Sequence, residues 1–205
     1  SGRILVYDLY LPRKFDPATD APLPVLVWFH GGSFLEGCIK DYDASGLAAA
    51  TGAMVVAVSY RLSVLGFLAL PELLDEGSPT NYGLLDQQLG LQWVQSNAEA
   101  FGADPQKVTI DGQSAGGAAV AFHLVMPASR GLFRGAILQS PGGRKGWVQD
   151  LKENDNDGES RAELIYNGEQ LSAARGCGAA PSTSRLACLR NLSLPTLLAE
   201  PFGRF

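Results

Sequence analysis

One serine of this chain lies between glycines in a pattern that could carry out acyl transfer. Residues 112–116 read Gly-Gln-Ser-Ala-Gly, which matches Gly-x-Ser-x-Gly with Ser114 at its centre. The segment follows the short predicted strand 108–111 (Val-Thr-Ile-Asp) directly and leads into the apolar, small-residue stretch 114–126. A strand, a tight turn and a helix in this order form a nucleophile elbow, in which the serine hydroxyl projects above a sheet. We therefore interpret Ser114 as a nucleophile.

The residue types around this serine fit that chemistry. Gly112 and Gly116 lack the side chains that would collide with a neighbouring strand or helix at a tight turn. The N–H groups at the start of the following helix would lie where negative charge develops on the substrate oxygen. The alternative is that Ser114 only caps the helix.

A second glycine loop favours the nucleophile. The sequence His-Gly-Gly-Ser-Phe occupies residues 30–34. Its first residue, His30, is also the last residue of the largely apolar segment 25–30. In acyl-transfer enzymes, a loop of this type after an early strand supplies further backbone N–H donors to the oxyanion. The alternative is a plain glycine-rich turn. The glycine loop precedes the serine motif, as it does in enzymes that combine the two. Their occurrence in this order favours acyl transfer.

The chain contains two histidines, and neither suits the role of catalytic base. His30 precedes the nucleophile, whereas in folds with a nucleophile elbow of this type the order along the chain is serine, acid and then histidine. His123 lies nine residues after Ser114 on the same predicted helix. That spacing separates them by about 13 Å along the helix axis. We predict a packing or capping role for His123.

Strands and helices alternate along the chain. This order predicts an α/β fold with a mostly parallel sheet and helices on both faces. The predicted strands are residues 4–11, 25–30, 54–60, 108–111 and 136–139. The predicted helices are residues 44–50, 83–100, 114–126, 163–175, 185–191 and 195–200, with loops at 61–81 and 146–160. No linker or repeat divides the sequence, so we expect one domain over residues 1–205.

Composition narrows the function classes. Hydrophobic residues make up 46% and charged residues 18% of the 205 residues, which is enough for a packed core. The net charge of −5 argues against a nucleic-acid partner. No apolar run reaches the roughly 18 residues of a membrane span. The cysteines lack the spacing of a zinc site, and Cys177 and Cys188 could be a local disulfide or two buried thiols.

These motifs together resemble one family, the type-B carboxylesterases, which include the cholinesterases. Four further segments carry the resemblance besides the serine motif. They read FGADP at residues 101–105, VSYRLSVLGFLAL at 58–70, NYGLLDQQLGLQWVQ at 81–95 and LFRGAILQSPG at 132–142. The resemblance implies an α/β-hydrolase fold and cleavage of carboxylic esters through an acyl-enzyme on Ser114, without a metal or cofactor. A small-molecule ester is then the expected partner, and the oligomeric state stays open.

The family's site residues map onto this sequence one by one. The resemblance implies that the oxyanion donors are the N–H groups of Gly32, Ser33 and Ala115, and that Gly31 shapes the loop. It also implies three structural features: a buried salt bridge between Arg61 and Asp86, a disulfide between Cys177 and Cys188, and a free thiol at Cys38.

Departures from the family pattern also carry expectations. Gln113 stands where the family usually has glutamate, which argues against a preference for cationic substrates. Ser33 replaces a usual glycine or alanine, and its side chain narrows the acyl pocket. Family members are two to three times longer, so we expect a partial chain. The N-terminal segment, the C-terminal half, the triad acid and the triad histidine would then lie outside it.

Two alternatives to an active enzyme stay open. One is an inactive fragment or remnant, and the 205 residues by themselves are expected to be inactive for want of a base. The other is a non-catalytic adhesion or binding module of cholinesterase type, although the presence of Ser114, Gly31 and Gly32 argues against it. The cysteine pair and the glycosylation triplet at residues 191–193 favour secretion, with any signal region outside this chain.

Overall fold

The computed structural model describes residues 5–141, 168–178 and 182–199. These residues fall into two compact units. The first unit contains residues 5–61 and 83–141, and the second contains 62–82, 168–178 and 182–199. The expected single domain over residues 1–205 stays a prediction.

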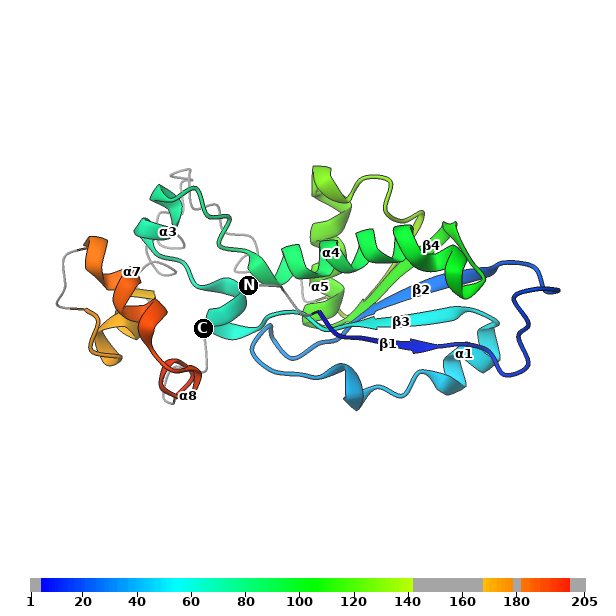
Figure 1. Cartoon of the computed structure of the whole chain (residues 1–205), viewed down its shortest axis with the longest axis horizontal. Coiled ribbons are helices and arrows are strands. Elements are labelled where there is room, and N and C mark those ends of the chain that lie inside the picture. Colours follow the sequence, from blue (N-terminus) through cyan, green and yellow to red (C-terminus); the bar gives the residue numbers. More distant parts are fainter. Residues whose placement is uncertain (1–4, 142–167, 179–181, 200–205) are drawn as a thin grey trace. The chain divides into compact units, whose positions relative to one another are not determined.

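A five-stranded sheet forms the centre of the first unit (Figure 1). Its strands are β1 (Tyr7–Tyr10), β2 (Leu23–Phe29), β3 (Met54–Val58), β4 (Ala103–Gln113) and β5 (Gly135–Gln139). Their spatial order is β1-β3-β2-β4-β5. Only β1 runs antiparallel to its neighbour, and the other pairs are parallel. The predicted mostly parallel sheet is therefore confirmed.

Burial explains why these segments form strands. All five residues of β3 are buried, as expected for a strand covered on both faces. In β2 the alternate residues Leu23, Val25, Val27 and Phe29 are buried. The parallel register places Phe29 beside Gly112 of β4, so the loops that follow these two strands start from one edge of the sheet. That shared edge brings the two sequence motifs together.

Helices cover both faces of this sheet, as the sequence predicts. In Figure 1, α4 (Tyr82–Asn97) and α5 (Ala115–Val125) lie on one side, and α1 (Ser45–Thr51) lies on the other. Short 3₁₀ turns complete the unit at Ile39–Asp41, Ala98–Phe101 and Pro127–Ser129.

The second unit is helical. It contains α2 (Ser63–Phe67), α3 (Pro71–Asp75), a helical segment at residues 168–174, α7 (Ser182–Asn191) and α8 (Leu194–Leu197). The prediction that residues 61–81 are mostly loop is therefore partly wrong, because α2 and α3 lie there. Pro71 begins α3 at a position where the missing N–H has no partner to lose, so this proline starts a helix and does not break one.

Two predicted elements of this region lie wholly or partly outside the described residues. The predicted loop at 146–160 lies entirely outside them. The predicted helix at 163–175 is described only from residue 168, and it is helical to residue 174.

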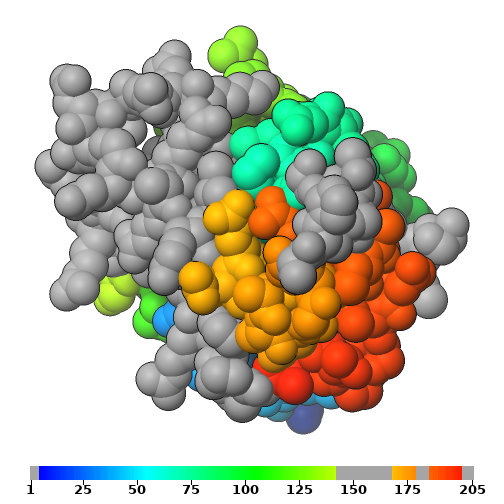
Figure 2. Space-filling model, turned by 90° about the vertical axis from the view of Figure 1, so that its left-hand side faces the viewer, coloured from blue at the N-terminus to red at the C-terminus, as the bar shows by residue number. Residues whose placement is uncertain are grey.

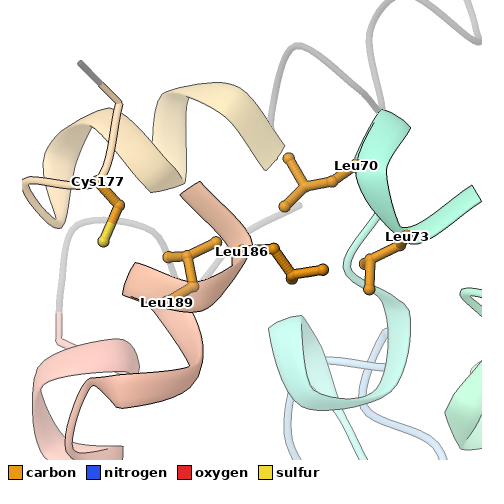
Figure 3. Packing of buried hydrophobic residues seen from close by; sticks show 5 residues of the cluster. All are labelled: Leu70, Leu73, Cys177, Leu186 and Leu189. Carbon is orange, nitrogen blue, oxygen red and sulfur yellow. The ribbon is translucent and has the colours of Figure 1, made fainter. Parts of the chain in front are cut away.

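A small apolar core holds the second unit together. Its buried members are Leu70, Leu73, Cys177, Leu186 and Leu189. Figure 3 shows Leu70, which precedes α3, and Leu73 of α3 on the side that faces Leu186 of α7. In Figure 2 the orange residues 168–178 and the red residues 182–199 pack side by side.

Covalent and ionic links reinforce this core. The predicted disulfide between Cys177 and Cys188 is present, with a Cα–Cα distance of 5.7 Å. Arg185 of α7 contacts the carboxylate of Glu72 of α3 at 2.6 Å. Cys38, in the first unit, is a free and exposed cysteine, as expected.

Candidate active site

The turn between β4 and α5 holds Ser114 in a strained conformation. Its φ of 55° and ψ of −119° lie outside the regions that non-glycine residues ordinarily adopt, which costs about 1–3 kcal/mol. The N–H of Ser114 donates to the carbonyl oxygen of Gln139 at 2.9 Å, which ties the turn to β5. The side chain is half-buried and makes no capping hydrogen bond to α5. The capping interpretation of this serine therefore has no support in the geometry.

The glycines of the motif are needed because backbone atoms come very close. A Cβ on Gly112 would lie 2.3 Å from the carbonyl oxygen of Gly116. A Cβ on Gly116 would lie 2.0 Å from the carbonyl oxygen of Phe29, at the end of β2. Both distances are far shorter than a carbon–oxygen contact permits. A side chain at either position would therefore force the backbone around Ser114 to shift.

The second glycine loop is also strained. Gly32, Ser33 and Phe34 have φ angles of 113°, 56° and 60°, a run of three residues in the left-handed region. The carbonyl oxygen of Gly32 accepts hydrogen bonds from the N–H groups of Leu35 and Glu36, at 2.9 and 3.1 Å. The side chain of Ser33 is exposed.

The two loops meet at Gly31. A Cβ on Gly31 would lie 3.3 Å from the Cβ of Ser114 and 2.8 Å from the carbonyl oxygen of Gln113. Among the described residues, no protein group accepts a hydrogen bond from the N–H of Gly32 or Ser33. Ala115 is the first residue of α5, where a backbone N–H has no partner inside the helix. The three N–H groups suggested as oxyanion donors therefore belong to loops that converge beside Ser114.

The side chain of His30 makes its contacts with its own loop and with Tyr60. Its Nδ1 donates to the carbonyl oxygen of Gly31 at 2.7 Å, and its ring stacks on Tyr60 with centroids 4.4 Å apart. Burial lowers the pKa of His30, and the hydrogen bond to Gly31 partly offsets that effect. These contacts agree with the expectation that His30 is not the catalytic base.

His123 is a packed residue, as predicted. It is 1% exposed, and its ring lies near Phe29. Its Nδ1 is 2.9 Å from the hydroxyl of Ser129, and its Nε2 is 3.2 Å from Oε1 of Gln87. Burial lowers the pKa of His123 to about 4. The side chain is therefore neutral near pH 7, and both of its ring nitrogens lie within hydrogen-bond distance of core residues.

Comparison with known proteins agrees with this geometry. The profile described as "Carboxylesterase family" matches residues 5–201. The chain belongs to the carboxylesterase family. It is 47% identical over 180 residues to the acetylcholinesterase of Gallus gallus, and the match covers 87% of this chain and 22% of that protein.

Two further relatives of this carboxylesterase-family chain are similar at lower identity. The pyrethroid hydrolase Ces2e of Rattus norvegicus is 41% identical over 180 residues, which cover 88% of this chain and 29% of that protein. Acetylcholinesterase 4 of Caenorhabditis briggsae is 40% identical over 187 residues, which cover 90% of this chain and 29% of that protein. The chain therefore spans between 22% and 29% of the length of these relatives.

Family membership settles the fold class. The five-stranded sheet with its flanking helices is part of the α/β-hydrolase fold of the carboxylesterase family. In the described part of the chain, no helix is both long and apolar enough to cross a bilayer.

The ion pair expected in a carboxylesterase-family chain is present. Nε of Arg61 lies 2.7 Å from Oδ2 of Asp86, and Nη2 donates to Oδ1 at 2.8 Å. The N–H of Arg61 also donates to Oδ2 at 3.0 Å. The pair was expected to be buried, but only the carboxylate is: the Asp86 side chain is 1% exposed and that of Arg61 is 36% exposed. The paired carboxylate fixes the chain just after β3.

A hollow of about 550 Å³ lies against the α1 side of the sheet. Trp28, Asp111 and Gln139 contribute to its otherwise largely apolar lining, and Ser114 does not. Nε2 of Gln139 donates to both carboxylate oxygens of Asp111 at 3.0 Å. Burial raises the pKa of Asp111, and this hydrogen bonding partly counteracts the effect. The hollow therefore lies beside the strands of the sheet and does not include the serine.

Two contributors to the site are not predicted by the sequence motifs. Gln139 accepts the N–H of Ser114 through its carbonyl, and Tyr60 donates its hydroxyl to the carbonyl of His30 at 2.6 Å. Tyr60 belongs to a Tyr-Arg pair, but the family pattern assigns a role only to the arginine of that pair. Neither contact leaves a sequence pattern, because each joins strand ends that are distant along the chain.

The buried histidine makes stability dependent on pH. The unfolded chain binds a proton at His123 below about pH 6.5, whereas the folded chain does so only near pH 4. Stability contributed by this residue is therefore present above pH 6.5 and falls as the pH drops toward 4. We expect the parent to lose about 2 kcal/mol more than His123→Gln between pH 7.5 and pH 5 in urea unfolding. Parallel pH profiles of the two proteins would contradict this expectation.

Proposed function

We propose that this chain carries the nucleophile of a serine carboxylic ester hydrolase. The observation that supports it most is the meeting of two strained loops. Ser114 has a φ of 55° at a strand–helix turn, and a Cβ on Gly31 would come within 3.3 Å of its Cβ. Strain of this kind persists where the surrounding structure enforces it, and it is concentrated at active sites. A hydroxyl beside converging N–H groups suits attack on a carbonyl carbon.

The proposed reaction proceeds through an acyl-enzyme. The Ser114 hydroxyl loses its proton to a base as its oxygen attacks the ester carbonyl carbon. The N–H groups of Gly32, Ser33 and Ala115 stabilise the negative charge on the carbonyl oxygen. The intermediate collapses, and the alcohol leaves with the proton that the base returns. The same base then takes a proton from water, which attacks the acyl-serine; the acid is released, and the base returns the proton to the Ser114 oxygen.

The base in this proposal is a histidine outside residues 1–205, oriented by an acid that is also outside them. The reason is the state of the two histidines within the chain. His30 donates to Gly31 and stacks on Tyr60, and His123 is buried with a pKa of about 4. Neither is free to take the proton of Ser114.

Carboxylic esters are the proposed substrates. Two relatives carry the name acetylcholinesterase and one carries the name pyrethroid hydrolase. Gln113, next to the nucleophile, is exposed and uncharged. This position therefore adds no negative charge that would favour a cationic ester.

Covalent labelling tests the proposal. The protein is expressed from its complete reading frame, treated with a fluorophosphonate and digested, and the modified peptide is identified by mass spectrometry. We expect one phosphonyl group on Ser114, because this probe reacts only with a serine that a base activates. Heat-denatured protein is the control and should remain unlabelled. A label on another serine, or none on the folded protein, would count against the proposal.

A further inference from the structure

Tyr60 contacts the oxyanion loop on both sides of its glycines. Its hydroxyl donates to the carbonyl oxygen of His30 at 2.6 Å, and its ring stacks on the imidazole with an interplanar angle of 19°. The same ring makes a T-shaped contact with Phe34, with centroids 6.3 Å apart. Tyr60 is 6% exposed and follows the end of β3, so it is anchored in the core of the first unit.

The loop between these two contacts needs external support. Ser33 and Phe34 are consecutive non-glycine residues with positive φ, and each costs about 1–2 kcal/mol in this region. Without restraint, such a segment would relax to a less strained backbone. Phe34 also packs near Phe122 of α5, with centroids 6.5 Å apart. The ends of the loop are therefore held by aromatic contacts.

Because the peptide bond is planar, these contacts also set the orientation of one N–H group, that of Gly32. The carbonyl of Gly31 and the N–H of Gly32 belong to one planar trans peptide and point in opposite directions. Nδ1 of His30 donates to that carbonyl at 2.7 Å, which fixes the direction of the Gly32 N–H. Tyr60 in turn fixes His30, through the ring by stacking and through the backbone by the hydrogen bond.

We propose that Tyr60 is a positioning residue of the oxyanion site. It acts through His30 and the Gly31–Gly32 peptide, and it touches neither the substrate nor Ser114. The inference rests on the proposed function, because the Gly32 N–H matters for catalysis only if it binds an oxyanion. A residue of this kind affects the transition state more than the bound substrate, because the oxyanion exists only in the former.

Replacement of Tyr60 by phenylalanine tests the proposal. Tyr60→Phe keeps the stacked ring and removes only the hydrogen bond to His30. The matched control is Tyr10→Phe, which removes a similar hydrogen bond, from the Tyr10 hydroxyl to the carbonyl oxygen of Tyr42 at 3.2 Å. Both variants are made in the protein expressed from its complete reading frame, and hydrolysis of a p-nitrophenyl ester is followed.

We expect Tyr60→Phe to lower kcat about 10- to 100-fold with KM nearly unchanged, less than the loss of a whole oxyanion donor. The inhibition constant of a trifluoromethyl ketone, whose adduct carries an oxyanion, should rise by the same factor as kcat/KM falls. Tyr10→Phe should show neither change. His30→Phe, which keeps a ring for stacking but lacks the Nδ1 donor, should lower kcat in the same way and provides the test if Tyr60→Phe does not fold.

The outcomes separate this inference from the proposed function. If kcat of Tyr60→Phe equals that of Tyr10→Phe, Tyr60 has no positioning role. A higher KM with unchanged kcat would assign Tyr60 to substrate binding and would also overturn the inference. If the parent is active and Ser114→Ala retains that activity, the proposed function itself is wrong, whatever Tyr60→Phe does.

Discussion

Ser114→Ala is expected to lower kcat for ester hydrolysis by roughly four to six orders of magnitude, because it removes the atom that forms the acyl-enzyme. The change deletes one oxygen from a half-buried side chain that makes no capping hydrogen bond, so the fold should be preserved. The measurement is steady-state hydrolysis of a p-nitrophenyl ester by the protein expressed from its complete reading frame. Ser96→Ala, at an exposed serine of α4, is the control and should retain full activity.

The backbone strain at Ser114 predicts that a second substitution at this position abolishes activity but raises stability. Ser114→Gly is expected to be equally inactive but more stable than the parent by about 1 kcal/mol, because glycine adopts a φ of 55° and a ψ of −119° without strain. Midpoints of urea unfolding for the alanine and glycine variants measure the difference. Substantial activity in Ser114→Ala would refute the nucleophile. Equal stability of the two variants would refute the strain.

The second large effect concerns the glycine after the nucleophile. Gly116→Ala is expected to destabilise the protein by about 3 kcal/mol or more, because the new Cβ would lie 2.0 Å from the carbonyl oxygen of Phe29. A flexible side chain could move aside, but the neighbour at this position is the backbone of β2. Relief of the clash must displace the end of that strand and the oxyanion loop after it. We therefore expect kcat to fall together with the midpoint of thermal unfolding.

Gly46→Ala is the matched control for this substitution. Gly46 lies in α1, and apart from its chain neighbours and the adjacent helix backbone no atom is within 4 Å of the position that its Cβ would occupy. Alanine there should be neutral or should stabilise the protein by about 0.5–1 kcal/mol, since alanine is the better helix former. If Gly116→Ala and Gly46→Ala have similar unfolding midpoints, the close contact between α5 and β2 is not present in solution.

Local sequence patterns predicted the parts of the site that are continuous along the chain. Residues 112–116 predict the elbow at Ser114, because glycines at fixed spacing between a strand and a helix permit one kind of turn. The five strands followed from runs of apolar residues. Residues 61–81 have no steady period, so the short helices α2 and α3 were not predicted. Helices of five residues are stabilised by tertiary packing, such as that of Leu73 in one buried cluster with Leu186 and Leu189, which their own sequence does not show.

By itself the sequence determined the nucleophile candidate, the order of strands and helices, and the family, because each depends on residues that are neighbours in the chain. Only the tertiary structure decided that Gly31 lies against Ser114 and that Tyr60 holds His30. It also decided that His123 loses its affinity for a proton. These properties depend on which strand ends meet and on how completely water is excluded. Packing of the whole sheet and its helices sets both.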